Sequence, residues 1–174
     1  MIICKSGRIL RSQPGFTLIE VILALAITCL IGGGVSTATI QILKQGVRNG
    51  DYTTASQYTM NAVYWISRDA EMSQTVTTDG VSGFPLTLSW TDWGSAEYQV
   101  VYTIEDDKLK RSYSVNGGEP SQTVVAEYVN TISENTTCEF ASRVLTMQVT
   151  TTIGQGAHAV SVTNRRKIFI RSSP

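Results

Sequence analysis

A long apolar run dominates the N-terminal part of the chain. Between Phe16 and Leu43 the only side chain that is charged at neutral pH is Glu20, and residues 21–31 are almost continuously apolar. A bilayer core requires roughly 20 apolar residues in helical form, and this run supplies that length. The pattern predicts a membrane-spanning helix over residues 16–43. A charge in hydrocarbon costs on the order of 2.5–3.5 kcal/mol, so the carboxylate at the leading edge of the run needs an explanation.

A second hydrophobic period follows after residue 43. Apolar side chains recur there at steps of three and four residues, at Ala55, Tyr58, Ala62, Trp65, Ile66, Met72 and Val76. This spacing predicts an amphipathic helix over residues 44–78 with one face to bury. Arg68, Asp69 and Glu71 are expected to lie off or beside that face.

The remainder of the chain, residues 79–174, has the pattern of a β-rich head domain. Runs rich in β-branched residues alternate with turn signals, and they cover residues 84–90, 98–104, 109–115, 122–129, 143–153 and 159–171. Such a pattern favours an antiparallel sheet. Because the amphipathic helix needs a cover, we predict an α+β fold in which the long N-terminal helix packs on this sheet.

Charge is distributed unevenly along a chain that is neutral as a whole. Lys5, Arg8 and Arg11 precede the apolar run, and without residues 1–15 eleven basic side chains would face fourteen acidic ones. Positive charge before a membrane helix favours a cytoplasmic amino end and an exported head. The mild acidity of the remainder argues against nucleic-acid binding through bulk charge. The basic stretch at 164–167, with Arg171, is interpreted as the charge of an edge strand, with DNA contact as the lesser alternative.

Three ordinary explanations of the apolar run compete. A secretory signal with cleavage after Ala38 would have a carboxylate opening its apolar region and would sever the helix pattern from its start. A lipoprotein signal would need small residues before Cys29, where Ile27 and Thr28 stand. A plain single-pass anchor leaves Glu20 and the Pro–Gly pair at 14–15 unexplained.

The stretch "GFTLIEV" at 15–21 resembles the signature of type IV prepilins and pseudopilins. Members of that family have a short basic leader ending in Gly, then Phe, and a Glu at the fifth mature position, and Gly15, Phe16 and Glu20 match these positions. The resemblance implies that a prepilin peptidase removes residues 1–15 by cleavage between Gly15 and Phe16 and then methylates the new Phe16 amine. Glu20 would pair with the amine of a neighbouring subunit, so that burial of the carboxylate drives assembly.

The head shows no convincing catalytic or metal-binding pattern. His158 is the only histidine and is interpreted as an exposed turn residue, and residues 105–108 (EDDK) are interpreted as a solvated hairpin tip. Cys4, Cys29 and Cys138 lie in three different environments, so we expect no internal disulfide and interpret Cys138 as a small buried hydrophobe. We expect no enzymatic activity, no cofactor and no metal.

The sequence therefore predicts a structural subunit of a type IV pilus or of a type II secretion or competence pseudopilus, and it favours a minor subunit. A minor subunit is favoured because the chain lacks the terminal cysteine pair of many major pilins, and because residues 63–76 are similar to minor pseudopilins of the J type. Expected partners are the prepilin peptidase, other pilin or pseudopilin subunits, the inner-membrane assembly platform and membrane lipid. The protein is expected first in the cytoplasmic membrane and then in a cell-surface or periplasmic filament. The alternative is a single-pass membrane protein whose exported β domain binds a ligand.

Overall fold

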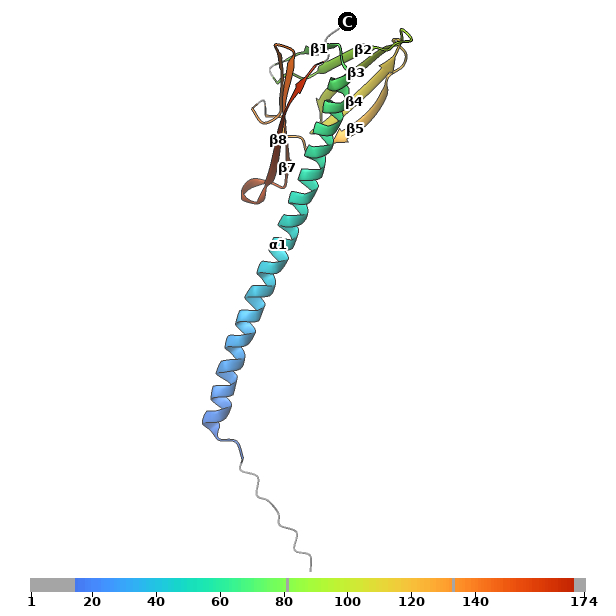
Figure 1. Cartoon of the computed structure of the whole chain (residues 1–174). Coiled ribbons are helices and arrows are strands. Elements are labelled where there is room, and N and C mark those ends of the chain that lie inside the picture. The colour runs from blue at the N-terminus through green and yellow to red at the C-terminus, as the bar shows by residue number, and fades with distance from the viewer. Residues whose placement is uncertain (1–14, 81, 133, 171–174) are drawn as a thin grey trace, which may run out of the picture. The chain divides into compact units, whose positions relative to one another are not determined.

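The computed structural model describes residues 15–80, 82–132 and 134–170. In these residues one long helix precedes a series of strands (Figure 1). The chain divides into two compact units between Gln45 and Gly46. The described part of the first unit is helical from Leu18 onward, and the second unit contains the end of the helix and all the strands that the structure describes.

Helix α1 extends from Leu18 to Met72, and so ends before the predicted boundary at residue 78. The backbone N–H and the hydroxyl group of Ser73 both donate to the carbonyl oxygen of Ala70, at 3.1 and 2.8 Å, and close the last turn. Strand β1 (Thr75–Thr78) follows and pairs with β2. The prediction of helix through residue 78 is wrong because these four β-branched residues have low helix propensity and gain a strand partner instead.

The first sheet has five antiparallel strands in the order β1-β2-β3-β4-β5. Its further strands are β2 (Leu86–Thr91), β3 (Glu97–Glu105), β4 (Lys108–Val115) and β5 (Ser121–Ala126). The predicted hairpin at 105–108 is confirmed, since Glu105 pairs with Lys108 across a two-residue turn. Asp106 and Asp107 both have positive φ, at 51° and 56°, as a turn that matches the twist of its strands requires.

A second, three-stranded sheet has the order β6-β7-β8, where a single sheet was expected. Its strands are β6 (Thr137–Ala141), β7 (Val144–Ile153) and β8 (Val160–Phe169), of which β6 was not predicted. The loop between β1 and β2 contacts the second sheet where the backbone N–H of Cys138 donates to the Ser82 carbonyl oxygen at 2.8 Å. Gly83 makes this approach possible, because its φ is +78° and a Cβ there would lie 1.7 Å from the Cys138 carbonyl oxygen.

The part of α1 in the second unit is joined to both sheets. Thr59 Oγ1 lies 2.6 Å from Thr151 Oγ1 of β7, and the Asn61 side chain donates to the Val125 carbonyl oxygen of β5 at 2.6 Å. Helix residues Ala55, Ala62, Val63, Ile66 and Ala70 are buried, and all but Ala55 belong to one continuous core with residues of both sheets. The predicted α+β class is confirmed, with the correction that two sheets rather than one flank the helix.

The predicted buried stripe of the helix is right in part. Ala55, Ala62 and Ile66 are fully buried, whereas Tyr58 and Trp65 are only partly buried and pack against the core. Met72 is 40% exposed, because the helix ends there. The largest departure is Asp69, which is buried although it was expected beside the stripe.

Candidate site for processing and membrane assembly

The first part of α1 presents a continuous apolar surface. Its large hydrophobic side chains are exposed along the whole segment, with Leu18 and Leu30 each at 78%. Among the described residues, α1 is the one helix long and apolar enough to cross a membrane, with a mean hydropathy of 2.3 over its most apolar window. Exposed apolar surface of this extent is typical of a membrane or protein interaction site. At 1.5 Å per residue, the helix is long enough to cross a hydrocarbon core of about 30 Å.

Hydroxyl groups within this segment are satisfied by the helix itself. Thr28 donates to the Ala24 carbonyl oxygen at 2.8 Å, and Ser36 donates to that of Gly32, also at 2.8 Å. Thr39 donates to Val35 in the same way at 2.9 Å. Because each hydroxyl has a partner one turn back, these residues do not present unsatisfied donors to lipid.

Thr17 and Glu20 define the start of the helix. The Thr17 hydroxyl oxygen accepts a hydrogen bond from the backbone N–H of Glu20 at 3.4 Å, and the Thr17 carbonyl oxygen accepts the N–H of Val21 at 3.2 Å. Thr17 is thus the N-cap and Glu20 lies at the third helical position, which is the spacing of a capping box. Sequence reasoning missed this role of Thr17, although the Thr-x-x-Glu spacing before an apolar run was the signal for it.

The helix dipole favours the charged form of Glu20, whereas the apolar segment that follows disfavours it. A carboxylate in the first helical turn interacts favourably with the positive end of the helix dipole. None of the ion pairs among the described residues includes Glu20, and it is followed by the apolar segment. Phe16, four residues earlier, is 84% exposed just outside the helix. The leader bases Lys5, Arg8 and Arg11 lie outside the described residues.

A second polar cluster lies in the head and was not predicted. Asp69, only 1% exposed, accepts two bonds from the Arg111 guanidinium: Nε donates to Oδ2 at 2.7 Å and Nη2 donates to Oδ1 at 3.0 Å. The Tyr102 hydroxyl donates to the same Oδ2. The spacing of Asp69 from Ala62 and Ile66 placed it on the buried face, and this was the available signal.

The Arg111 guanidinium is also held by aromatic rings. Its central carbon lies 5.1 Å from the ring centroid of Trp65 on α1 and 5.1 Å from that of Tyr113 on β4. Such cation–π contacts add to the ion pair. Burial, and then the neighbouring Asp69 carboxylate, raise the pKa of Tyr102 above its usual value, so the phenol stays protonated. We interpret this cluster as a clamp between the helix and the first sheet.

The head residues singled out in the sequence lie apart from one another. His158 is exposed in a 3₁₀ turn, Gly156–His158. At the EDDK hairpin the Lys110 ammonium contacts Glu105 at 2.6 Å, and no cluster of three or more metal-ligating side chains occurs among the described residues. Cys138 is a buried free thiol, and burial raises its pKa from 9.0 to about 12. The expectation that Cys138 is an inert buried residue agrees with this environment.

The basic stretch at 164–167 lies on the edge strand β8, as predicted. Arg165, Arg166 and Lys167 are exposed. Arg166 approaches Glu71 of α1 at 3.9 Å, whereas Arg171 lies outside the described residues. Charge at this edge discourages pairing with another strand.

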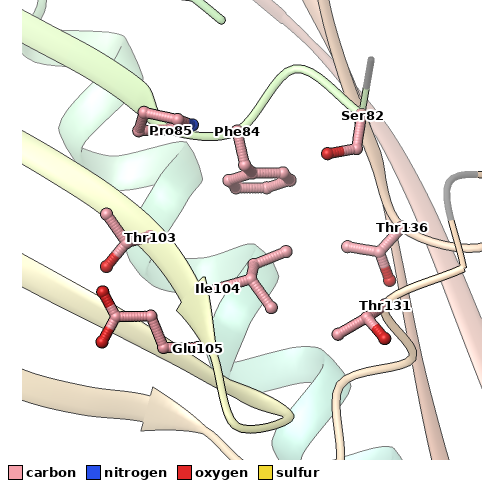
Figure 2. Close-up of a pocket in the computed structure, with 8 residues that line it drawn as sticks. All are labelled: Ser82, Phe84, Pro85, Thr103, Ile104, Glu105, Thr131 and Thr136. Carbon is pink, nitrogen blue, oxygen red and sulfur yellow. The ribbon is translucent and has the colours of Figure 1, made fainter. Parts of the chain in front are cut away.

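A hollow of about 340 Å³ opens between the end of β3 and the loops before β2 and β6. Figure 2 shows Phe84 and Ile104 facing one another, with Thr131 and Thr136 on one side and Thr103 and Glu105 on the other. Glu105, the one carboxylate among the described residues of the lining, is engaged with Lys110. The hollow is therefore a mixed apolar and hydroxyl-lined surface rather than a converging set of reactive groups.

Comparison with known proteins gives one match. Residues 10–36 match the family model described as the prokaryotic N-terminal methylation motif, which includes Gly15, Phe16 and Glu20. No curated protein matches the chain, and no solved structure matches it. The match ends within the apolar helix, so the head lies wholly outside it.

The motif and the fold together define the class of protein. Residues 10–36 carry a prepilin-type methylation motif, as type IV pilin-like proteins do, and the chain has an α+β pilin-like fold. This class is structural and not enzymatic. The motif implies processing by a prepilin peptidase and assembly with other pilin-like subunits, and with the apolar helix it indicates the inner membrane and then a pilus.

Proposed function

We propose that this chain is a minor subunit of a type IV pilus, or of a type II secretion or competence pseudopilus. The observation that carries the proposal is an exposed apolar helix that begins with Glu20 in its first turn, directly after the Gly15–Phe16 bond of a methylation motif. The head is exported and the amino end stays cytoplasmic. The work of the protein is architectural: the apolar helix packs with lipid and then with other helices.

Processing changes the electrostatics of the helix start. Hydrolysis of the Gly15–Phe16 bond leaves an amine on Phe16, which the same enzyme methylates. Once residues 1–15 are removed, a positive charge lies within about one turn of Glu20. Before cleavage this segment carries the carboxylate without that counter-charge.

Assembly follows from the free energy of the carboxylate. Two opposite charges 4 Å apart attract by about 4 kcal/mol at an effective dielectric constant of about 20. That is comparable with the roughly 2.5–3.5 kcal/mol that a charge costs near the centre of a membrane helix. A contact between Glu20 of one subunit and the Phe16 amine of the next thus offsets the cost of moving Glu20 into a helix bundle.

The mature amino terminus tests this function directly. The protein is isolated from cells that contain an active prepilin peptidase, and its N-terminal peptide is analysed by mass spectrometry. The expected result is N-methylphenylalanine at position 16. A matched sample from cells with an inactive peptidase should retain residues 1–15. An intact leader in the first sample, or a terminus after Ala38, would contradict the proposal.

A membrane-anchored domain that binds a ligand is the second candidate function, and the hollow in Figure 2 is the observation that favours it. In that case the anchor would only tether the head. Replacement of Glu20 would then leave ligand binding unchanged. The filament proposal instead requires that this replacement abolish filament assembly.

A further inference from the structure

The edge strands of the two sheets differ in how they are protected from pairing with another strand. Each sheet has two edge strands, which are β1 and β5 in the first and β6 and β8 in the second. Strands β1 and β6 lie against each other near the Ser82–Cys138 hydrogen bond. Strand β8 carries three exposed basic side chains at 165–167, which oppose strand addition. Strand β5 is the remaining edge.

Strand β5 lacks the charge and the proline with which natural proteins block an edge, although its ladder with β4 has a register shift between Leu109 and Lys110. Its six residues, Ser121–Ala126, include no charge and no proline, and the first four are exposed. Val124 is 46% exposed on the face of the sheet that points away from α1. Apart from its ladder with β4, β5 has one hydrogen bond among the described residues, from the Asn61 side chain to the Val125 carbonyl oxygen. An uncharged, exposed edge of this length offers free backbone donors and acceptors to another strand.

A shallow, widely open hollow along one face of α1 adjoins this edge. It has a volume of about 590 Å³ and is lined by Thr54, Gln57, Tyr58, Met60, Asn61 and Tyr64. Asn61 reaches β5 through Val125, and the Tyr58 hydroxyl donates to Glu127 just beyond the strand at 3.2 Å. Figure 1 shows β5 as the outermost strand of its sheet, beside this part of α1. Met60 and Tyr64 are 55% and 56% exposed, so the hollow offers apolar surface to a neighbour of β5.

We propose that β5 and the adjacent hollow of α1 form a strand-addition site for an extended, uncharged segment of a different protein chain. The segment pairs its backbone with Ser121–Val124. Its alternate side chains, which point toward the helix, fill the hollow beside Met60 and Tyr64, and the others point to the outer face beside Val124. An edge strand next to a helix supplies backbone affinity and side-chain specificity together.

The chemistry of the site defines the segment that fits it. Side chains in a strand alternate between the two faces, so the segment needs apolar residues at every second position. Among the described residues no basic or acidic side chain lines the hollow, so a charged residue pointing into it would find no ionic partner there. This inference concerns the head alone and does not depend on filament assembly.

The test uses the full chain in lipid nanodiscs and an acetylated, amidated decapeptide in which valine and threonine alternate. A peptide of the same composition with all valines before all threonines is the control ligand. Hydrogen exchange measured by mass spectrometry reports on residues 118–127. We expect the alternating peptide to slow exchange at 121–124 by about tenfold or more at saturation, and the block peptide to have no effect.

Two variants connect the protection to the proposed site. Val124→Lys places a charge on the edge, and Tyr64→Ser removes apolar surface from the hollow; both side chains are exposed, so the fold is preserved. Each should weaken binding of the alternating peptide about tenfold. Gln99→Lys is the matched control, because Gln99 is exposed but lies on β3, in the middle of the sheet. This variant adds the same charge away from the edge and should leave the affinity for the peptide unchanged.

Three results would overturn the proposal. The first is no protection of 121–124 by the alternating peptide at millimolar concentration. The second is protection that survives both Val124→Lys and Tyr64→Ser. The third is protection that appears without peptide and increases with protein concentration, because pairing between two copies of this chain would then occupy the edge.

Discussion

Replacing Arg111 with methionine removes the partner of a buried carboxylate. Asp69 is 1% exposed and would keep only the hydroxyl of Tyr102. Methionine has a similar length and can still pack between Trp65 and Tyr113, so the lost quantity is the charge pairing. Breaking a buried pair on one side destabilises a protein by about 3–5 kcal/mol. Since a domain of this size is stable by about 5–15 kcal/mol, Arg111→Met should remove a large share of the head's stability.

The opposite replacement should have a smaller effect. The Arg111 side chain is already 15% exposed, so after Asp69→Leu it can turn toward water. The remaining loss of stability comes from the Tyr102 hydroxyl, which no longer has a hydrogen-bond partner, and amounts to about 1–3 kcal/mol. In the double variant Asp69→Leu/Arg111→Met no uncompensated charge is buried, so it should be more stable than Arg111→Met alone. A positive coupling of this kind is the signature of an ion pair in a core.

Urea unfolding of the full chain in detergent micelles, followed by tryptophan fluorescence, measures these differences. Trp65 lies against Arg111 and reports on the clamp. With a slope of about 1–3 kcal/mol per molar urea, a loss of 3 kcal/mol lowers the midpoint by about 1–3 M. Lys110→Met is the control, because its ion pair with Glu105 is exposed and should hardly change the midpoint. A midpoint for Arg111→Met equal to that of the control, or strict additivity in the double variant, would refute the reasoning.

Three further predictions concern the amino terminus and the core thiol. Glu20→Ala should leave membrane insertion intact or improved and block incorporation into filaments, which cross-linking of membranes and filament yield measure; normal yield would argue against the docking role. Gly15→Ala should slow leader removal mildly and Gly15→Leu should stop it, as the mass of the N-terminal peptide would show; full processing of the leucine variant would contradict a peptidase site there. Burial raises the pKa of Cys138 from 9.0 to about 12, so above pH 9 the unfolded state releases a proton that the folded state keeps. The free energy of unfolding should therefore fall by up to about 1.4 kcal/mol per pH unit as the pH rises above 9. In Cys138→Ala this contribution to the pH dependence should be absent. An equal pH dependence in the variant and the wild type would mean that the thiol is not buried.

The helix and most strands could be predicted because their signals are local. The apolar run, the period after residue 43 and the hairpin at 105–108 depend on neighbouring residues only. The end of the helix was placed too late, since the competing partner of β1 is β2, which lies beyond an intervening loop. Strand β6 was missed for the same reason: it is short, and its pairing with β7 makes it a strand.

The clamp around Asp69 could be predicted only in part. The spacing of Asp69 from Ala62 and Ile66 is compatible with the buried face, yet Asp69 was expected beside that face, because a carboxylate is expected to be buried only when a partner is known. Arg111 lies on β4, and its approach to α1 results from the tertiary packing of the sheet on the helix. The N-terminal site is the reverse case: Gly15, Phe16 and Glu20 form a contiguous signal, and the family match covers all three.

The attachment of α1 in the head has a mechanical consequence. Within residues 46–72 the helix is joined to one sheet through Thr59 and Thr151, and to the other through Asn61 and Asp69. A force along the helix axis would load these links in shear and in parallel, rather than peel them apart one after another. The head would then resist extraction of its helix until several links on both sides rupture together, which suits a component of a fibre under tension.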